Sequence, residues 1–211
     1  EPSVGVAAGG YIRRTLGHPD KICRPGRFHP DGRENGRQYL TDRVRSIAMG
    51  SAIVRRSAVG GARFGENMAY DEDTLFWVSA MAGAAVVTIE RPVLIYHVSL
   101  ERADERFAIG ARGNFLAASR HYNGLVRKGT ITKKTARARK QLLALKTARV
   151  LYRRGNAASA ARFLRLAHGA NELDLVRQWQ AFRYRVRVAL AQRENSPSSD
   201  GDTVLRTTQR R

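Results

Sequence analysis

The sequence has little cysteine, no long hydrophobic run and few acidic residues in its second half. Cys23 is the single cysteine among 211 residues, which excludes an intrachain disulfide and fits a reducing compartment. The longest apolar stretch is residues 78–89, well short of the roughly 20 residues that a membrane-spanning helix needs. No signal peptide is recognisable at the N-terminus. We therefore expect a cytoplasmic protein without a spanning helix.

Positive charge is concentrated in the second half of the chain. The formal net charge is +20 and the sequence pI is ≈ 11.3. Residues 1–110 contain 15 Lys or Arg against 13 Asp or Glu, whereas residues 111–192 contain 19 against 2. A segment of that charge faces an anionic partner or stays solvated. We expect a nearly neutral domain followed by a basic region, with nucleic acid and the anionic inner face of a membrane as candidate partners.

The beginning of the chain predicts a strand and a long loop. Residues 3–9, ending at Gly9-Gly10, are apolar and small, as in a short buried strand. Residues 17–46 are rich in Gly, Pro, Arg and Asp and lack apolar periodicity, which is typical of a loop.

A helix and two strands are predicted farther along this first domain. Acidic residues favour the first turn of a helix, so Asp71-Glu72-Asp73 predicts a helix over 71–82. The β-branched run 84–89 predicts a strand. Arg91-Pro92 predicts a turn and residues 93–98 another strand.

The pattern becomes helical beyond Arg106. Apolar residues recur every three to four positions in three stretches, which predicts three amphipathic helices with their arginines facing solvent. The apolar positions are Ala138, Leu142, Leu145, Ala148 and Tyr152; Ala160, Phe163, Leu164 and Ala167; and Leu175, Trp179, Phe182, Val186 and Ala189. Asn156 and Asn171 are placed to cap the second and third helices. Residues 193–211 have the composition of a disordered tail.

Residues 47–97 contain five short motifs in a defined order. These are Gly50-Ser51 followed by Arg55-Arg56, the turn Arg63-Phe64-Gly65-Glu66, the acidic run 71–73, the β-branched run 84–89, and Arg91-Pro92 through Tyr96. The order resembles the second half of family-2 glycosyltransferases, which have the GT-A fold. Glu72-Asp73 matches the acidic pair that opens a helix under the acceptor site, and Phe64 matches the aromatic residue of the preceding turn. The expected fold class is α/β, a partial GT-A (Rossmann-like) mixed sheet layer followed by an all-helical C-terminal region.

The resemblance implies roles for individual residues. It implies inverting transfer of a sugar from a nucleotide-sugar donor to a saccharide or lipid-linked acceptor, with Asp73 as general base. Glu72, Gly50 and Ser51 are the implied substrate contacts. His97, after the last predicted strand, is the candidate ligand for the divalent metal, Mn²⁺ or Mg²⁺, expected in the full-length enzyme.

The chemistry of this reaction requires a carboxylate such as Asp73. Inversion at the anomeric carbon is a displacement, so the acceptor hydroxyl needs a general base on the face opposite the leaving diphosphate. An Asp in the first turn of a helix is favoured as the anion, because the helix dipole and free N–H groups stabilise its charge. The alternative interpretation of Asp73 is an ordinary acidic helix start.

The nucleotide-binding half of the family is not recognisable in this sequence. That half should contain a D-x-D motif, and none occurs before residue 50; the two present are residues 71–73 and 200–202. Residues 1–6 resemble the segment shortly after the missing motif, and the chain begins at Glu1 rather than Met. We therefore expect a C-terminal fragment of a longer enzyme of cell-wall or polysaccharide biosynthesis, inactive by itself.

A second hypothesis is a basic helical protein that binds nucleic acid or a membrane without catalysis. It explains the charge of residues 111–192. No known nucleic-acid-binding module is recognisable there, and this hypothesis leaves the motif order of residues 47–97 unexplained.

Overall fold

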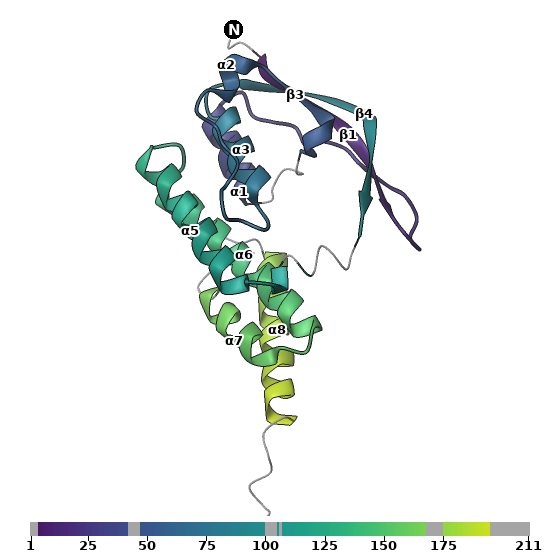
Figure 1. Ribbon diagram of the computed structural model, residues 1–211, viewed down its shortest axis with the longest axis vertical. Coiled ribbons are helices and arrows are strands. Elements are labelled where there is room, and N and C mark those ends of the chain that lie inside the picture. The colour runs from purple at the N-terminus through teal and green to yellow at the C-terminus, as the bar shows by residue number, and fades with distance from the viewer. Residues whose placement is uncertain (1–3, 42–46, 100–104, 106, 168–174, 195–211) are drawn as a thin grey trace, which may run out of the picture.

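The structure is a computed structural model that describes residues 4–41, 47–99, 105, 107–167 and 175–194. It is a mixed α/β structure, in which a four-stranded sheet covered on one face by helices is followed by a helical region (Figure 1). The elements in chain order are β1 (Val4–Thr15), β2 (Lys21–Cys23), α1 (Gly32–Leu40), η1 (Met49–Ser51), β3 (Ala52–Val54), α2 (Arg56–Val59), α3 (Glu72–Met81), β4 (Ala85–Val98), α5 (Ala111–Arg127), α6 (Lys133–Arg153), α7 (Ala157–Leu166) and α8 (Leu175–Glu194).

β1 is the central strand of the sheet. β4 runs parallel to it along the whole of Val4–Thr15. The other edge of β1 is shared by β3, antiparallel at Val6–Ala8, and by β2, antiparallel at Tyr11–Arg13. Parallel strands need a crossover connection, and the chain between β1 and β4 supplies it with α1 and α3.

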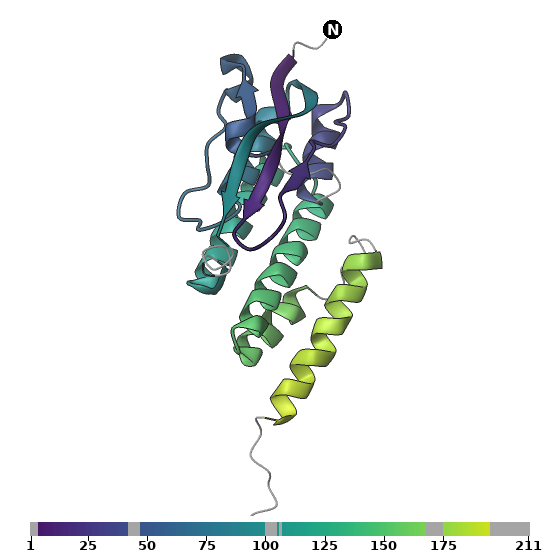
Figure 2. The ribbon, with the colours of Figure 1, turned by 90° about the vertical axis from the view of Figure 1, so that its right-hand side faces the viewer.

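The two faces of the sheet are covered unequally. On the inner face, Val6 and Ala8 are completely buried in the core that α1 and α3 share. Side chains alternate between the faces of a strand, so Ala7 lies on the other side, flanked in register by Ile53 of β3 and Val87 of β4. Ile53 is 78% exposed and Val87 is 42% exposed. We call the side of the sheet that carries these three residues the outer face; in Figure 2 the sheet stands in front of the helices that cover its inner face.

α3 is buried on nearly all sides, which is typical of a helix held between layers. Trp77 at its centre is completely buried. α1 packs against α3 so closely that a Cβ atom added to Gly32 would lie 2.0 Å from the carbonyl oxygen of Met81. The helix predicted over 71–82 is confirmed.

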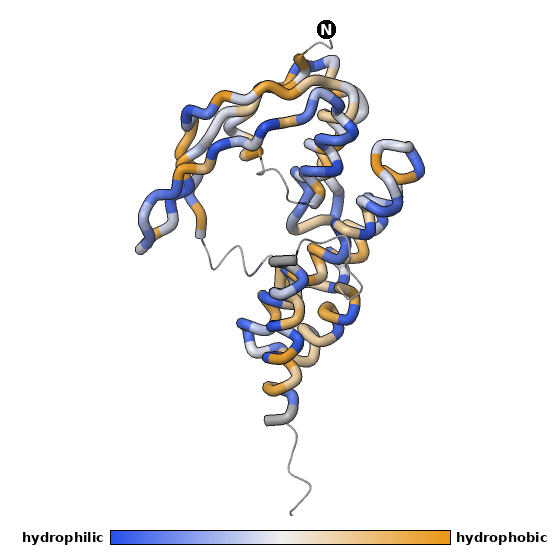
Figure 3. The backbone as a smooth tube through the Cα atoms, turned by 180° about the vertical axis from the view of Figure 1, so that it is seen from behind, coloured by the Kyte–Doolittle hydropathy of each residue, from blue (hydrophilic) through white to orange (hydrophobic). Residues whose placement is uncertain are grey.

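The helical region is built from consecutive helices that pack on one another, α5 on α6, α6 on α7 and α7 on α8. Hydrophilic and hydrophobic residues are interspersed along these helices (Figure 3). The helix predicted through Ala138 and Tyr152 is confirmed as α6. The predicted cap is also confirmed, since the Asn156 side chain accepts a hydrogen bond of 3.0 Å from the Ser159 backbone N–H. Asn171 lies outside the described residues.

The tail predicted over 193–211 lies mostly outside the described residues. Its first two residues are the end of α8, and the description stops at Glu194. Among the described helices, none combines the length and the apolar character needed to cross a bilayer.

The loop predicted over 17–46 is wrong in two places. β2 pairs with the second half of β1 and forms a hairpin, and α1 follows it. Asp31 caps α1 by accepting a hydrogen bond of 2.9 Å from the backbone N–H of Arg33. Tertiary burial stabilises this helix in the absence of an apolar repeat, since Asn35 and Leu40 are completely buried.

The strand predictions are too short. β1 continues past Gly9-Gly10 to Thr15, and β4 continues through Arg91-Pro92 where a turn was predicted. The register shifts there, so that Gly9 pairs with Ile89 and Gly10 with Pro92. Such a bulge accommodates a proline, which has no N–H for the ladder. A Cβ on Gly10 would lie 3.0 Å from the Glu90 carbonyl oxygen, so glycine lets the two strands remain paired.

Candidate functional site

Three acidic residues open α3, and each has a different environment. Asp71 precedes the helix in a left-handed conformation with φ of 71° and does not cap it with its side chain. Glu72 and Asp73 form the first helical turn. The Asp71 side chain therefore does not cap the backbone of α3, and instead accepts a hydrogen bond of 3.0 Å from the hydroxyl of Thr74.

Asp71 is part of a buried network that joins α3 to the helical region. Its carboxylate pairs with the guanidinium of Arg139 from α6, with 3.0 Å between Asp71 Oδ2 and Arg139 Nε. The hydroxyl of Tyr122 from α5 donates to the same carboxylate. Arg139 Nη1 also donates to the carbonyl oxygen of Leu40 at 3.3 Å. Both side chains of the ion pair are less than a tenth exposed, so this pair fixes α6 against the ends of α1 and α3.

The network keeps Asp71 ionised. Burial alone raises the pKa of a carboxyl group. Here the positive charge of Arg139, together with hydrogen bonds from Arg139 and Tyr122, outweighs burial, so the pKa of Asp71 lies below its ordinary value. Asp71 is a structural anion whose oxygens are engaged by other groups.

Asp73 has the opposite environment. Burial and the nearby negative charge of Asp71 raise its pKa above the ordinary value, against weaker opposing effects of Thr74 and Arg139. The Thr74 hydroxyl lies 3.4 Å from Asp73 Oδ1. Within the described part of the chain Asp73 forms no ion pair. Asp73 is therefore a partly buried carboxylate that is easier to protonate than an ordinary Asp, and the expectation that the helix start favours its anion is wrong, because burial and the charge of Asp71 outweigh the helix dipole.

Tyr39 of α1 belongs to the surroundings of Asp73. Its ring is 4% exposed, and its hydroxyl accepts a hydrogen bond of 3.1 Å from the Ile47 backbone N–H. Burial and then the charge of Asp73 raise the pKa of Tyr39. The two groups are thus close enough to interact electrostatically, and Tyr39 remains neutral.

The other predicted substrate contacts lie on different elements. Gly50 and Ser51 form the end of η1, and a Cβ on Gly50 would lie 3.1 Å from Leu94 Cδ2 of β4. Ser51 is 4% exposed and its hydroxyl donates to the carbonyl oxygen of Ala48 at 2.9 Å. Glu72 is partly exposed beside Asp73. Glu72 is therefore the predicted contact that shares the first turn of α3 with Asp73.

His97, the candidate metal ligand, is exposed near the C-terminal end of β4, opposite Arg14 of β1. Arg14 forms an ion pair with Asp20. The hydrogen bond from Arg14 is the main cause that lowers the pKa of Asp20, with a smaller contribution from His97. Across the described ranges, no three His, Cys, Asp or Glu side chains are arranged to hold a metal ion.

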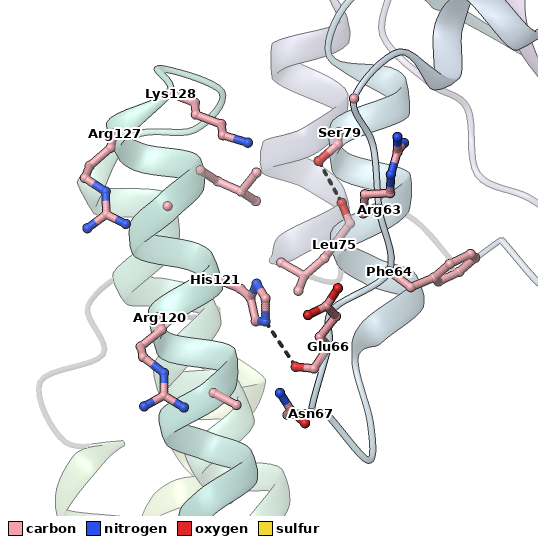
Figure 4. A pocket seen from close by; sticks show the side chains of 14 residues that line it. Arg63, Phe64, Glu66, Asn67, Leu75, Ser79, Arg120, His121, Arg127 and Lys128 are labelled. Atoms are coloured by element: carbon pink, nitrogen blue, oxygen red, sulfur yellow. Dashed lines mark hydrogen bonds between the residues drawn. The ribbon is translucent and has the colours of Figure 1, made fainter.

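A cavity of about 440 Å³ lies between α5, α3 and the loop that precedes α3 (Figure 4). Its lining contains the basic residues Arg63, Arg120, His121, Arg127 and Lys128, with Glu66 as the one acidic residue. His121 Nε2 lies 3.3 Å from the backbone oxygen of Glu66, and its ring points from α5 toward the loop.

The cavity and Asp73 occupy different sides of α3. Leu75 and Ser79 line the cavity from α3. Residues two and six positions after Asp73 point away from it around a helix of 3.6 residues per turn. The size and the basic lining of the cavity suit a small anionic group, held away from the Asp73 carboxylate.

The sequence prediction missed the partnership of Asp71 with Arg139 and Tyr122. One signal was present. Arg139 lies three positions before Leu142 and four before Leu143, which places it on the apolar side of its helix, and a buried arginine needs an acidic partner. The prediction that the arginines of the helical region face solvent is wrong for this residue, which is 4% exposed.

Comparison of the chain with models of protein families, with curated proteins and with solved structures finds no match.

Proposed function

We propose that this chain carries the acceptor-side half of a GT-A catalytic domain of the family-2 glycosyltransferase type, and that Asp73 is its general base. The observation that carries the proposal is the contrast between two neighbouring carboxylates. Asp71 is ionised and paired with the positive charge of Arg139. Asp73 is partly buried, lacks an ion pair within the described residues and has a raised pKa. Neighbouring acids whose pKa values are driven apart are characteristic of acid–base sites.

The topology supports the proposal. β1 and β4 are parallel, and the acidic pair Glu72-Asp73 opens the last helix of the crossover between them. The five motifs of residues 47–97 lie, in chain order, on η1 and the start of α2, in the loop before α3, at the start of α3 and along β4. The apolar outer face of the sheet is also what a partial GT-A layer would present, since α/β sheets of this type bury both faces.

In the proposed reaction Asp73 accepts the proton of the acceptor hydroxyl. The oxygen of that hydroxyl forms a bond to the anomeric carbon of the donor sugar, and the bond to the nucleotide diphosphate breaks on the opposite face. The diphosphate leaves with the electron pair, so configuration inverts. The raised pKa makes Asp73 a stronger base than an exposed Asp, provided that the pH is high enough to ionise it. Glu72 would bind acceptor hydroxyls from the same helical turn.

The expected divalent metal receives no step in this mechanism. His97 lies beside the Arg14–Asp20 ion pair, and the described residues do not gather a ligand set around it. In the proposal the metal and the donor diphosphate belong to the nucleotide-binding half.

The test uses the polypeptide encoded by the whole reading frame that contains residues 1–211, assayed for sugar transfer with a panel of nucleotide sugars. Loss of a general base typically costs 10²–10⁴ in rate, so Asp73→Asn should lower kcat by about that factor and leave donor affinity unchanged. Glu72→Gln is the matched control, and we expect it to raise the KM for the acceptor with a smaller loss of kcat. A normal kcat for Asp73→Asn would remove the proposal.

The second hypothesis, a basic protein without catalysis, is supported by the surface of α8, where exposed apolar side chains lie beside arginines. Nucleic acid is the less favoured partner, because the exposed side chains of α8 that accompany its arginines are apolar.

A further inference from the structure

α8 carries an apolar stripe that faces away from the rest of the helical region. Trp179, Phe182, Val186 and Leu190 are 58%, 52%, 43% and 53% exposed. Their spacing of three, four and four positions places them on one side of the helix. The rings of Trp179 and Phe182 stack, with centroids 5.5 Å apart and 23° between their planes.

A different side of α8 attaches it to the protein. Ala181 and Val188 are 5% and 2% exposed and belong to the core shared with α6 and α7. At 3.6 residues per turn these two positions lie roughly opposite the stripe. In Figure 2, α8 stands at the end of the molecule distant from the sheet, with the other helices on one side of it. Attachment of α8 therefore leaves the stripe uncovered by the described residues.

Arginines flank the stripe, and no acidic residue interrupts it. The segment from Gln178 to Gln192 contains three arginines and no Asp or Glu. Arg183 and Arg187 are exposed on one flank of the stripe, and the Arg187 guanidinium lies 5.8 Å from the Tyr184 ring centroid. Arg185 lies on the other flank. A helix with aromatic and aliphatic residues on one side and cations beside them suits the interface of an anionic membrane.

We propose that α8 binds the surface of anionic lipid membranes in the plane of the interface, with its stripe among the acyl chains and Arg183 and Arg187 at the headgroups. Long basic side chains can keep their charge in the headgroup region while their stems cover apolar surface. Binding to a nucleic acid would leave the four apolar side chains of the stripe without an apolar partner. The proposal does not depend on glycosyl transfer, and its test uses no activity.

The experiment mixes residues 1–211 with vesicles of phosphatidylcholine alone or of equimolar phosphatidylcholine and phosphatidylglycerol. The chain has two tryptophans, of which Trp77 is completely buried and Trp179 is 58% exposed. Anionic vesicles should shift the fluorescence emission to the blue, and the shift should disappear in Trp179→Phe. Binding should weaken as salt rises, because headgroup attraction is screened.

Matched variants separate the stripe from general charge. Phe182→Asp should weaken vesicle binding about tenfold, whereas Leu116→Asp, with the same charge change at another exposed apolar residue, should not. Arg183→Gln with Arg187→Gln should weaken it about tenfold or more. Arg112→Gln with Arg137→Gln removes two exposed charges from α5 and α6 and should have a small effect.

Four results would overturn the proposal. These are absence of binding, equal binding to neutral and anionic vesicles, equal losses in the test and control variants, and a blue shift that appears without vesicles as protein concentration rises. The last result, if abolished by Phe182→Asp, would assign the stripe to contact with a second copy of the chain.

Discussion

Asp71 and Asp73 lie two positions apart, yet the protein stabilises the anion of one and destabilises that of the other. Arg139 and Tyr122 surround Asp71 with positive charge and a hydrogen-bond donor. Burial and repulsion from the charge of Asp71 both disfavour the anion of Asp73, which has no ion pair among the described residues. An acidic helix start requires no such contrast. The acidic run itself could be predicted from the sequence, but the contrast could not, because Arg139 lies 68 positions away from Asp71.

Asp73→Asn should raise the melting temperature at pH 7. A folded-state pKa above the unfolded value means that folding disfavours the ionised carboxylate, so its contribution to stability is fully present below the unfolded pKa and is lost as pH rises through the folded pKa. The amide is neutral at every pH and avoids this loss. Melting temperatures of both proteins between pH 3 and pH 8 should therefore converge in acid and separate near neutrality. A lower melting temperature for the variant at pH 7 would favour the ordinary helix start.

Removing one partner of the Asp71–Arg139 ion pair should destabilise the fold more than removing both partners together. Asp71→Asn removes the buried carboxylate that balances the charge of Arg139, and breaking a buried pair from one side typically costs about 3–5 kcal/mol. Asp71→Asn with Arg139→Met removes both charges and should cost less than the sum of the single changes. Urea unfolding of the four proteins measures the coupling. The lowered pKa of Asp71 adds a pH signature: its stabilisation is present above the unfolded pKa and is lost as pH falls through the folded pKa. Additive single effects would contradict the pair.

At the scale of elements, the sequence predicts well where a local pattern decides. α6 and the Asn156 cap follow from helical periodicity and side-chain chemistry. α1 was missed because its residues carry no apolar repeat, and its stability comes from packing on α3. Three of the four stripe residues of α8, Trp179, Phe182 and Val186, were predicted to lie on one apolar side of this helix. The sequence alone does not tell which side of α8 meets the core. In the structure Ala181 and Val188 face the core.

Two glycines in helices should respond oppositely to alanine. Gly32→Ala would drive a Cβ to 2.0 Å from the Met81 backbone oxygen, so α1 must move from α3, at a cost of about 1–3 kcal/mol. Gly124 of α5 has no atom closer than 4.0 Å to an added Cβ, and alanine there should stabilise the protein by about 0.5–1 kcal/mol. Denaturant unfolding of both variants measures these changes. Equal effects of the same sign would contradict the close packing of α1 on α3.

At the scale of the whole molecule, exposed apolar surface occurs both on the sheet and on the helical region. The α/β part presents an apolar outer sheet face with Ile53 and Val87 exposed on it, and the helical region presents the stripe of α8 among arginines. Sequence composition predicted the division of charge between the two parts. The uncovered sheet face could not be predicted, because it depends on β3 and β4 lying on either side of β1.

Ile53→Lys should distinguish a sheet face that remains exposed from one that a further layer covers. In residues 1–211 alone, Ile53 is 78% exposed, so lysine should change the free energy of unfolding by no more than about 0.5 kcal/mol. If a nucleotide-binding half completes the layer, as proposed, the same substitution in the whole reading frame buries an unpaired charge and should cost several kcal/mol. Leu16→Lys is the control, because Leu16 is 98% exposed in the turn between β1 and β2 and should be neutral in both proteins. A small effect of Ile53→Lys in both proteins would show that the outer face stays exposed, and would remove the sheet layer from the case for a glycosyltransferase half.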